Sequence, residues 1–206
     1  MNVNDSKKTV QYNKGNNISP VGFIFACPGQ KEQAAQKVVS GSTGNNLNLL
    51  ISSLSGTSNS SVRLLFPTTD RYDYLITNAS EIIHYPAHDG RSLPTRKEYM
   101  TERNIERLCD ELKNLRLVIA FGVQAKEVAQ AVEKAYKEKG VEQSPHFITS
   151  LPHLSFLSLN RIAVDVNGEP ILRGDKDGTW KRIEVVRMAL EKEIMAMNNE
   201  KKNNKE

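Results

Sequence analysis

The chain has 206 residues, of which 38% are hydrophobic and 25% charged, and its formal net charge is +4 at pH 7. That length suits one α/β domain with a substantial core, and the mild positive charge indicates an anionic partner only weakly. The two cysteines, Cys27 and Cys109, exclude a disulfide framework and a four-cysteine metal or iron–sulfur site within the chain. The sequence has no apolar stretch of membrane-spanning length and no signal-peptide pattern, so we expect a cytoplasmic protein without membrane contact.

Polar residues dominate both ends of the chain. Residues 1–19 are rich in Asn, Lys and Ser, which predicts a mobile N-terminal arm. Residues 198–206 predict a disordered polar tail, which we interpret as a solvated end, although basic tails can also contact nucleic acid electrostatically. A single domain is therefore expected over residues 20–197.

Apolar runs alternate with helix-like segments along this domain. The predicted strands are residues 21–26, 72–78, 115–121 and 146–151. The predicted helices are residues 32–39, 47–54, 95–113, 124–139 and 179–197. Thr95 and Glu98 form a capping-box pattern at the third helix, whereas residues 79–94 predict a loop long enough to suggest function. Strands that alternate with helices predict a three-layer α/β/α fold with a four-stranded, mostly parallel sheet.

Short polar patterns follow three of the predicted strands. Cys27-Pro28-Gly29-Gln30 follows the first strand, Asn78 ends the second, and Pro152-His153 follows the last. Ligands of parallel sheets bind at the carboxyl ends of the strands. A turn, an amide and an imidazole at this edge predict a pocket for a polar, planar ligand.

The order of these motifs resembles the uracil-DNA glycosylase superfamily, most closely its iron–sulfur branch, over residues 21–195. The segments that carry the resemblance are Pro28-Gly29-x-x-Glu32, Gly41-x-x-Gly44 followed by Leu49-Leu50, Thr77-Asn78, Pro94-Thr95-x-x-Glu98, Ile119-Ala120-Phe121-Gly122-x-x-Ala125 and Pro152-His153-x-Ser155. No single segment is specific, but their order along the chain is.

The resemblance implies a monofunctional DNA glycosylase, which hydrolyses the N-glycosidic bond of a flipped base and leaves an abasic site. Asn78 would read the edge of a pyrimidine, because an amide both donates and accepts hydrogen bonds. His153 would donate a hydrogen bond to the pyrimidine O2 as negative charge builds on the departing base. The structural alternatives are an Asn that only caps a strand end and a solvated loop histidine.

Other positions carried over from the family line the base pocket or contact DNA. The predicted pocket residues are Ala26, Cys27, Pro28, Gly29, Gln30, Val39 and Ser42. The predicted DNA contacts are Gly44, Asn45, Arg91, Ser155, Leu157 and Arg161. Among these, Ser155 would hold a phosphate and Leu157 would fill the gap left by the flipped base. A core position for Leu157 and plain surface positions for the two arginines are the alternatives.

The chain lacks a carboxylate that the branch uses. Ala26 stands at the position of the motif Glu, and Glu32 is the nearest acidic residue at a family position, so we name Glu32 as its substitute. In the alternative, leaving-group stabilisation alone carries the reaction, with water positioned by Gln30 or backbone. A second alternative is a non-catalytic nucleic-acid-binding protein that kept the fold.

The pocket wall also differs from the branch. Val38-Val39-Ser40 stands where the branch stacks a Phe on the base, and Ser42 replaces an Arg. Smaller side chains predict a roomier pocket for a uracil-like or larger base, such as a modified cytosine of the kind some phages use, unless Tyr85 fills the gap. Either DNA repair or antiviral defence would suit such an activity. Without the branch's cysteine ligands we expect no iron–sulfur cluster, no metal, no cofactor, and a monomer that acts on DNA.

Overall fold

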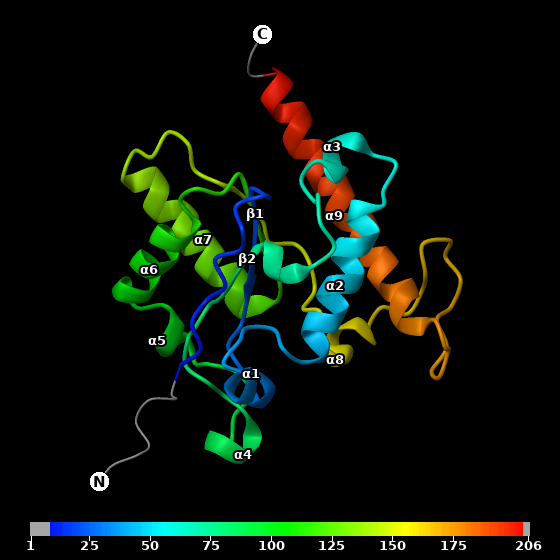
Figure 1. The fold of residues 1–206 in the computed structure, drawn as a ribbon, viewed down its shortest axis with the longest axis horizontal. Helices are drawn as coiled ribbons and strands as arrows, with labels where there is room; N and C mark the ends of the chain where they lie inside the picture. The colour runs from blue at the N-terminus through cyan, green and yellow to red at the C-terminus, as the bar shows by residue number, and fades with distance from the viewer. Residues whose placement is uncertain (1–8, 204–206) are drawn as a thin grey trace.

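Four parallel strands form the sheet at the centre of the protein (Figure 1). The computed structural model describes residues 9–203, and side chains through residue 199. The strands are β1 (Val21–Phe25), β2 (Leu75–Asn78), β3 (Leu117–Ala120) and β4 (His146–Ile148). They lie in the order β2-β1-β3-β4, and every neighbouring pair is parallel, as the sequence predicts.

Helices cover both faces of the sheet (Figure 1). The described helices are α1 (Gln30–Ala35), α2 (Ser42–Ser55), α3 (Ser60–Arg63), α4 (Pro86–Asp89), α5 (Arg96–Tyr99), α6 (Glu102–Leu112), α7 (Val123–Glu138), α8 (Phe156–Leu159) and α9 (Gly178–Asn203), with a 3-10 helix, η1 (Arg71–Asp73), before β2. Helices α2, α3, α8 and α9 lie on one side, and α5, α6 and α7 on the other. The three-layer α/β/α prediction is confirmed.

Each face of the sheet has its own hydrophobic core. Phe23 and Phe25 of β1 point to the core shared with α2 and α9, whereas Ile24 points to the core shared with α6 and α7. All five residues of β1 are buried. Burial on both faces explains why this strand is a continuous apolar run rather than an alternating one.

The predicted helix over residues 95–113 is two helices. The capping box is present, with the Thr95 backbone N–H donating to Glu98 at 2.6 Å, but α5 ends at Tyr99. Helix α6 then starts anew because the Thr101 side chain accepts a hydrogen bond from the Asn104 backbone N–H. A second N-cap inside one apolar pattern divides the helix without changing its hydrophobic spacing.

Both predicted disordered ends are more ordered than expected in their described parts. Asn13 exchanges backbone hydrogen bonds with Ile76 of β2, at 2.8 and 2.9 Å, and Val10 is buried. Residues 1–8 of the predicted arm lie outside the described residues. At the other end α9 continues to Asn203, and residues 204–206 lie outside the described residues. Backbone pairing of polar residues explains the order at the N-terminal side.

Candidate functional site

The structure brings the first and last motifs together at the carboxyl edge of the sheet. Phe25, which ends β1, pairs with Asn78, which ends β2. The ring of Phe25 also meets the ring of His153 edge-on, with centroids 5.8 Å apart. The turn after β1, the strand-end amide and the late histidine therefore share one edge, although they come from three distant segments.

His153 is held as a neutral hydrogen-bond donor. Burial lowers the pKa of this imidazole below its usual value. The Ser155 backbone N–H donates to Nδ1 at 3.0 Å, so the neutral ring carries its hydrogen on Nε2. Gly122 lets His153 pack closely, because a Cβ at Gly122 would lie 3.3 Å from both the Cβ and the ring Cδ2 of His153. Nε2–H remains available for a ligand.

A cleft of about 870 Å³ opens beside His153. Ser155, Leu157 and Arg161 of the predicted DNA contacts line it. Leu157 is 76% exposed, so it is not a core residue. The Ser155 hydroxyl accepts from the Ser158 backbone N–H and thereby caps α8. The last motif thus supplies the imidazole and one wall of the cleft together.

Asn78 is buried, and its backbone carbonyl is hydrogen-bonded by a side chain of helix α6. Its side chain makes no hydrogen bond to another residue of the described part of the chain, so the amide is free to meet a ligand. Arg107 donates to the Asn78 carbonyl oxygen at 2.9 Å and to the Thr77 hydroxyl at 3.1 Å. The same guanidinium reaches Glu111 at 2.7 Å. Arg107 therefore fixes the end of β2, where Asn78 leaves the sheet.

Sequence reasoning missed Arg107, because residues 95–113 predicted only a structural helix. The available signal was the spacing of Asn104, Arg107 and Glu111, which places them on one face of α6. Asn104 also donates to the carbonyl oxygen of Ala79 at 2.7 Å. The face of α6 that contacts the end of β2 is therefore polar. Sequence patterns alone assign the polar face of an amphipathic helix to solvent, so this contact was not predicted.

Glu32 joins the first two motifs. Its carboxylate accepts the backbone N–H of Gly29 at 3.1 Å and that of Gly41 at 3.1 Å, one on each oxygen. Gly29 and Gly41 begin α1 and α2, respectively, so one side chain links the starts of both helices. This geometry gives Glu32 a holding role, and its predicted catalytic role stays a prediction.

Asn46 is a second link that sequence reasoning missed. It is 2% exposed in α2 and donates to the Leu154 carbonyl oxygen at 2.8 Å. This bond ties α2 to the loop that carries His153. The predicted helix begins at residue 47, one residue too late to include Asn46, whereas α2 begins at Ser42 and buries this amide, which then needs a partner.

Gly44 allows the chain before α2 to pass close to the helix. A Cβ on Gly44 would lie 1.7 Å from the Val39 carbonyl oxygen. Gly44→Ala should therefore lower the free energy of unfolding by about 1–3 kcal/mol or more, measured by denaturant unfolding. Gly56→Ala, at the other end of α2, is the matched control, because its nearest contact lies at 3.4 Å. Equal stability of the two variants would contradict this role of Gly44.

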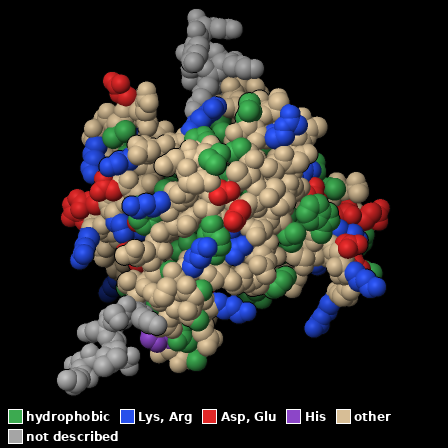
Figure 2. All heavy atoms as spheres, viewed as in Figure 1, with side chains coloured by type: hydrophobic (Ala, Val, Ile, Leu, Met, Phe, Trp, Pro, Cys, Tyr) green, Lys and Arg blue, Asp and Glu red, His purple; other side chains and the backbone are tan. Residues whose placement is uncertain are grey.

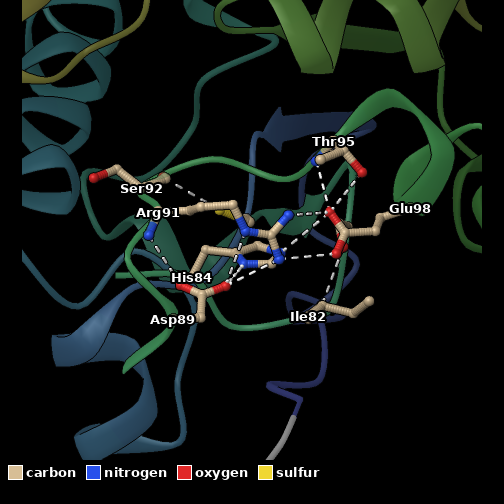
Figure 3. Close-up of polar contacts among 9 residues, drawn as sticks. Ile82, His84, Asp89, Arg91, Ser92, Thr95 and Glu98 are labelled. Carbon is tan, nitrogen blue, oxygen red and sulfur yellow. Dashed lines mark hydrogen bonds and ion pairs between the residues drawn. The ribbon is translucent and has the colours of Figure 1, made fainter. Parts of the chain in front are cut away.

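Arg91, a predicted phosphate contact, lies between two carboxylates (Figure 3). It contacts Asp89 at 3.0 Å and Glu98 at 3.0 Å. A hydrogen bond from His84 holds the pKa of Asp89 at about 2, and the bond from Arg91 holds that of Glu98 at about 2. The guanidinium is therefore engaged within its own loop, and its contact with DNA stays a prediction.

Cys27 lines the turn after β1 as a neutral thiol. Its sulfur lies 3.8 Å from the Ser92 carbonyl oxygen, to which it donates. Burial, with the nearby charges of Glu32, Asp89 and Glu98, raises the pKa of Cys27 to about 12. A thiol so hard to ionise is a poor nucleophile, and the predicted lining role of Cys27 stays a prediction.

Among the described residues that line the cleft beside His153, none is Asn78 or one of the predicted pocket residues Ala26, Cys27, Pro28, Gly29, Gln30, Val39 and Ser42. Ala26, Pro28, Val39 and Gly44 are buried, whereas Gln30, Ser42, Asn45 and Arg161 are exposed. Within residues 9–199, no group of three or more His, Cys, Asp or Glu side chains is arranged to hold a metal ion. Within the described helices, none is long and apolar enough to cross a membrane.

Comparison with known proteins agrees with this geometry. A search of curated proteins found no match. A model of the family described as the uracil DNA glycosylase superfamily matches residues 14–170, which include the turn after β1, Asn78, His153 and the cleft residues of the last motif. With most of the chain matched, and with the motifs assembled at one edge of the predicted fold, the protein belongs to the uracil-DNA glycosylase superfamily.

Proposed function

We propose that the protein is a monofunctional DNA glycosylase that excises a flipped uracil-like or modified pyrimidine and leaves an abasic site. Members of the superfamily are typically DNA glycosylases, which act on DNA as hydrolases. The observation that carries the proposal is the imidazole of His153, with Nδ1 occupied and Nε2–H available beside a cleft of about 870 Å³. A cleft of this size is large enough for a base held outside the DNA stack.

The chemistry follows from where charge develops. As the bond between the base and C1′ of the sugar breaks, its electron pair leaves with the base, and water supplies hydroxide to C1′ and a proton to the base. The Nε2–H of His153 would donate to the pyrimidine O2, and such a donor contributes about 3–4 kcal/mol to the transition state. Asn78 would hold the edge of the base through its free amide.

No carboxylate replaces the one missing at Ala26 in this proposal. Glu32 already accepts two backbone N–H bonds, one on each oxygen, which supports a holding role over a water-activating one. Leaving-group stabilisation by His153 then carries the reaction, and water is positioned by backbone groups or Gln30. Glu32→Gln keeps one acceptor oxygen but turns an amide NH2 towards the other backbone N–H. A holding role predicts a lower free energy of unfolding for this variant, whereas a water-activating role predicts loss of base release by the protein that remains folded.

The charges that line the cleft support DNA binding there. On the face drawn in Figure 2, lysine and arginine side chains are scattered among acidic ones. Lys126 and Arg161 line the cleft itself, and Leu157 is exposed beside them, where it would fill the gap left by the flipped base. We propose that the protein acts there as a monomer, in the cytoplasm, without a cofactor.

The substrate we propose is a base larger than uracil, such as a bulky modified cytosine. Val38 and Val39, at the position of the branch's stacking Phe, are both buried, so they leave no large ring over the base. The Tyr85 hydroxyl donates to Gln33 at 2.8 Å, and its ring packs against the core that contains Val38 and Val39, so Tyr85 as the residue that fills the gap stays the alternative that the substrate panel tests. A glycosylase for such bases would suit antiviral defence, whereas a uracil preference would suit repair.

The experiment is base release, detected by mass spectrometry, from DNAs that contain uracil, hypoxanthine, hydroxymethylcytosine or glucosylated hydroxymethylcytosine. We expect one modified cytosine to be released and the strand to stay intact. Faster release of uracil than of any modified base would overturn the substrate proposal but keep the activity.

A non-catalytic DNA-binding protein of the same fold is the second candidate, and the alanine at position 26 favours it. If the protein binds these DNAs but releases no base from any of them, this candidate is established and the glycosylase proposal is overturned. For such a binding protein, the His153→Ala variant should bind DNA with the same affinity as the wild type, and neither protein should release a base.

A further inference from the structure

Leu93 is a large apolar side chain at the rim of the proposed active cleft. It is 49% exposed, and it lines the same cleft as His153 and Leu157. The two leucines come from different segments: Leu93 from the loop before α5, and Leu157 from helix α8. Exposed leucines cost free energy in water, so two of them facing one cleft indicate a partner with apolar surfaces.

The loop that carries Leu93 is held on both sides (Figure 3). On one side Arg91 bridges Asp89 and Glu98, each at 3.0 Å, and the ring of His84 lies 2.5 Å from Asp89. On the other side the Thr95 backbone N–H donates to Glu98 at 2.6 Å. Leu93 therefore sits on a braced loop, which reduces the conformational entropy lost when it contacts a partner.

The rest of the cleft suits a nucleic acid. Its charged lining residues, within the described part of the chain, are Lys126 and Arg161, and no acidic side chain lines it. Serines at positions 92, 150, 155 and 158 add neutral hydroxyls. Cations suit phosphates, hydroxyls suit sugars and phosphates, and leucines suit the faces of bases.

We propose that Leu93 contacts the complementary strand of a DNA duplex, at the base left unpaired by flipping, while Leu157 fills the gap on the target strand. This inference rests on the proposed function. Flipping leaves two apolar surfaces uncovered, one in each strand, and a single leucine covers one of them. Leu93 has no surface to cover in single-stranded DNA, so its contribution depends on the partner strand.

Binding tests this without relying on catalysis. The probe is a tetrahydrofuran abasic-site analogue, in a duplex and in the same strand alone, with dissociation constants measured for each protein. Leu93→Ala should weaken duplex binding about tenfold and single-strand binding less than about twofold, as the loss of one buried leucine contact predicts. Leu93→Met, which keeps the apolar volume, should retain duplex binding. Leu64→Ala, at an exposed leucine outside the cleft, is the matched control.

Two results would overturn the inference. Equal weakening on duplex and single strand would place Leu93 on the target strand or in the base pocket, and unchanged binding to both would remove it from the DNA contact. If wild-type protein releases no base yet shows the duplex-specific effect, the proposed glycosylase activity fails and the DNA contact of Leu93 stands. These failures are therefore distinguishable.

Discussion

His153→Ala should lower the rate of base release about 100-fold to 1,000-fold, because it removes the donor that we propose stabilises the charge on the departing base. DNA affinity should change little, since Leu157 and the cleft cations remain. Single-turnover release, with the dissociation constant measured in parallel, separates the two effects. His88→Ala is the control: His88 is an exposed histidine in α4 that does not line the cleft. A variant that keeps wild-type release would exclude His153 from the reaction.

The same imidazole sets a pH dependence with a defined sign. Burial lowers the pKa of His153, so the folded protein keeps it neutral at pH values where the unfolded chain, with a pKa of about 6.5, begins to take up a proton. Its contribution to stability is complete above the unfolded pKa and is lost as pH falls towards the lowered folded value. Protonation of Nδ1 would also break the bond from Ser155, so base release should fall in the same acidic range.

Arg107→Met should lower the free energy of unfolding by about 3–5 kcal/mol, because it leaves the buried carboxylate of Glu111 without its cation. Glu111 is 5% exposed at its side chain, and burial already raises its pKa despite Arg107. Unfolding by urea measures the change. The substitution also releases the Asn78 carbonyl oxygen, so the remaining folded protein should bind its base less well.

Two controls separate the unpaired charge from the general loss of a side chain. In a Glu111→Gln background, Arg107→Met should cost clearly less, since no buried charge is left behind. Lys113→Met, at the C-cap of the same helix, breaks an exposed pair with Asp110 and should cost less than about 1 kcal/mol. Equal costs for Arg107→Met and Lys113→Met would show that the buried pair does not anchor β2.

The sheet was predictable because its strands are apolar on both faces and end in recognisable turns. The break between α5 and α6 was not, because Thr101 begins a new helix without altering the apolar spacing. The ordered structure around Asn13 was not predicted for a different reason. Polar residues pair here through their backbone, and amino-acid composition does not indicate backbone pairing.

The sequence predicted which residues of the candidate site lie at this edge of the sheet, but it did not predict the hydrogen bonds that hold them there. Asn78 and His153 follow strands, and the carboxyl ends of parallel strands meet at one edge. The links made by Glu32, Asn46 and Arg107 join segments far apart in the chain, so they depend on distances that a sequence does not contain. The roles of all these residues in catalysis stay predictions until activity is measured.

The bridge from Glu32 to Gly41 has a consequence for how new substrates can arise. Residues 38–42, which we predict to form the pocket wall, are fixed at Gly41 by this bridge, while Asn78 and His153 are fixed by other contacts. Substitutions within the wall can therefore alter the space for a base and leave the reacting groups in place. Under the proposed function, such separation would let single substitutions change which base is accepted.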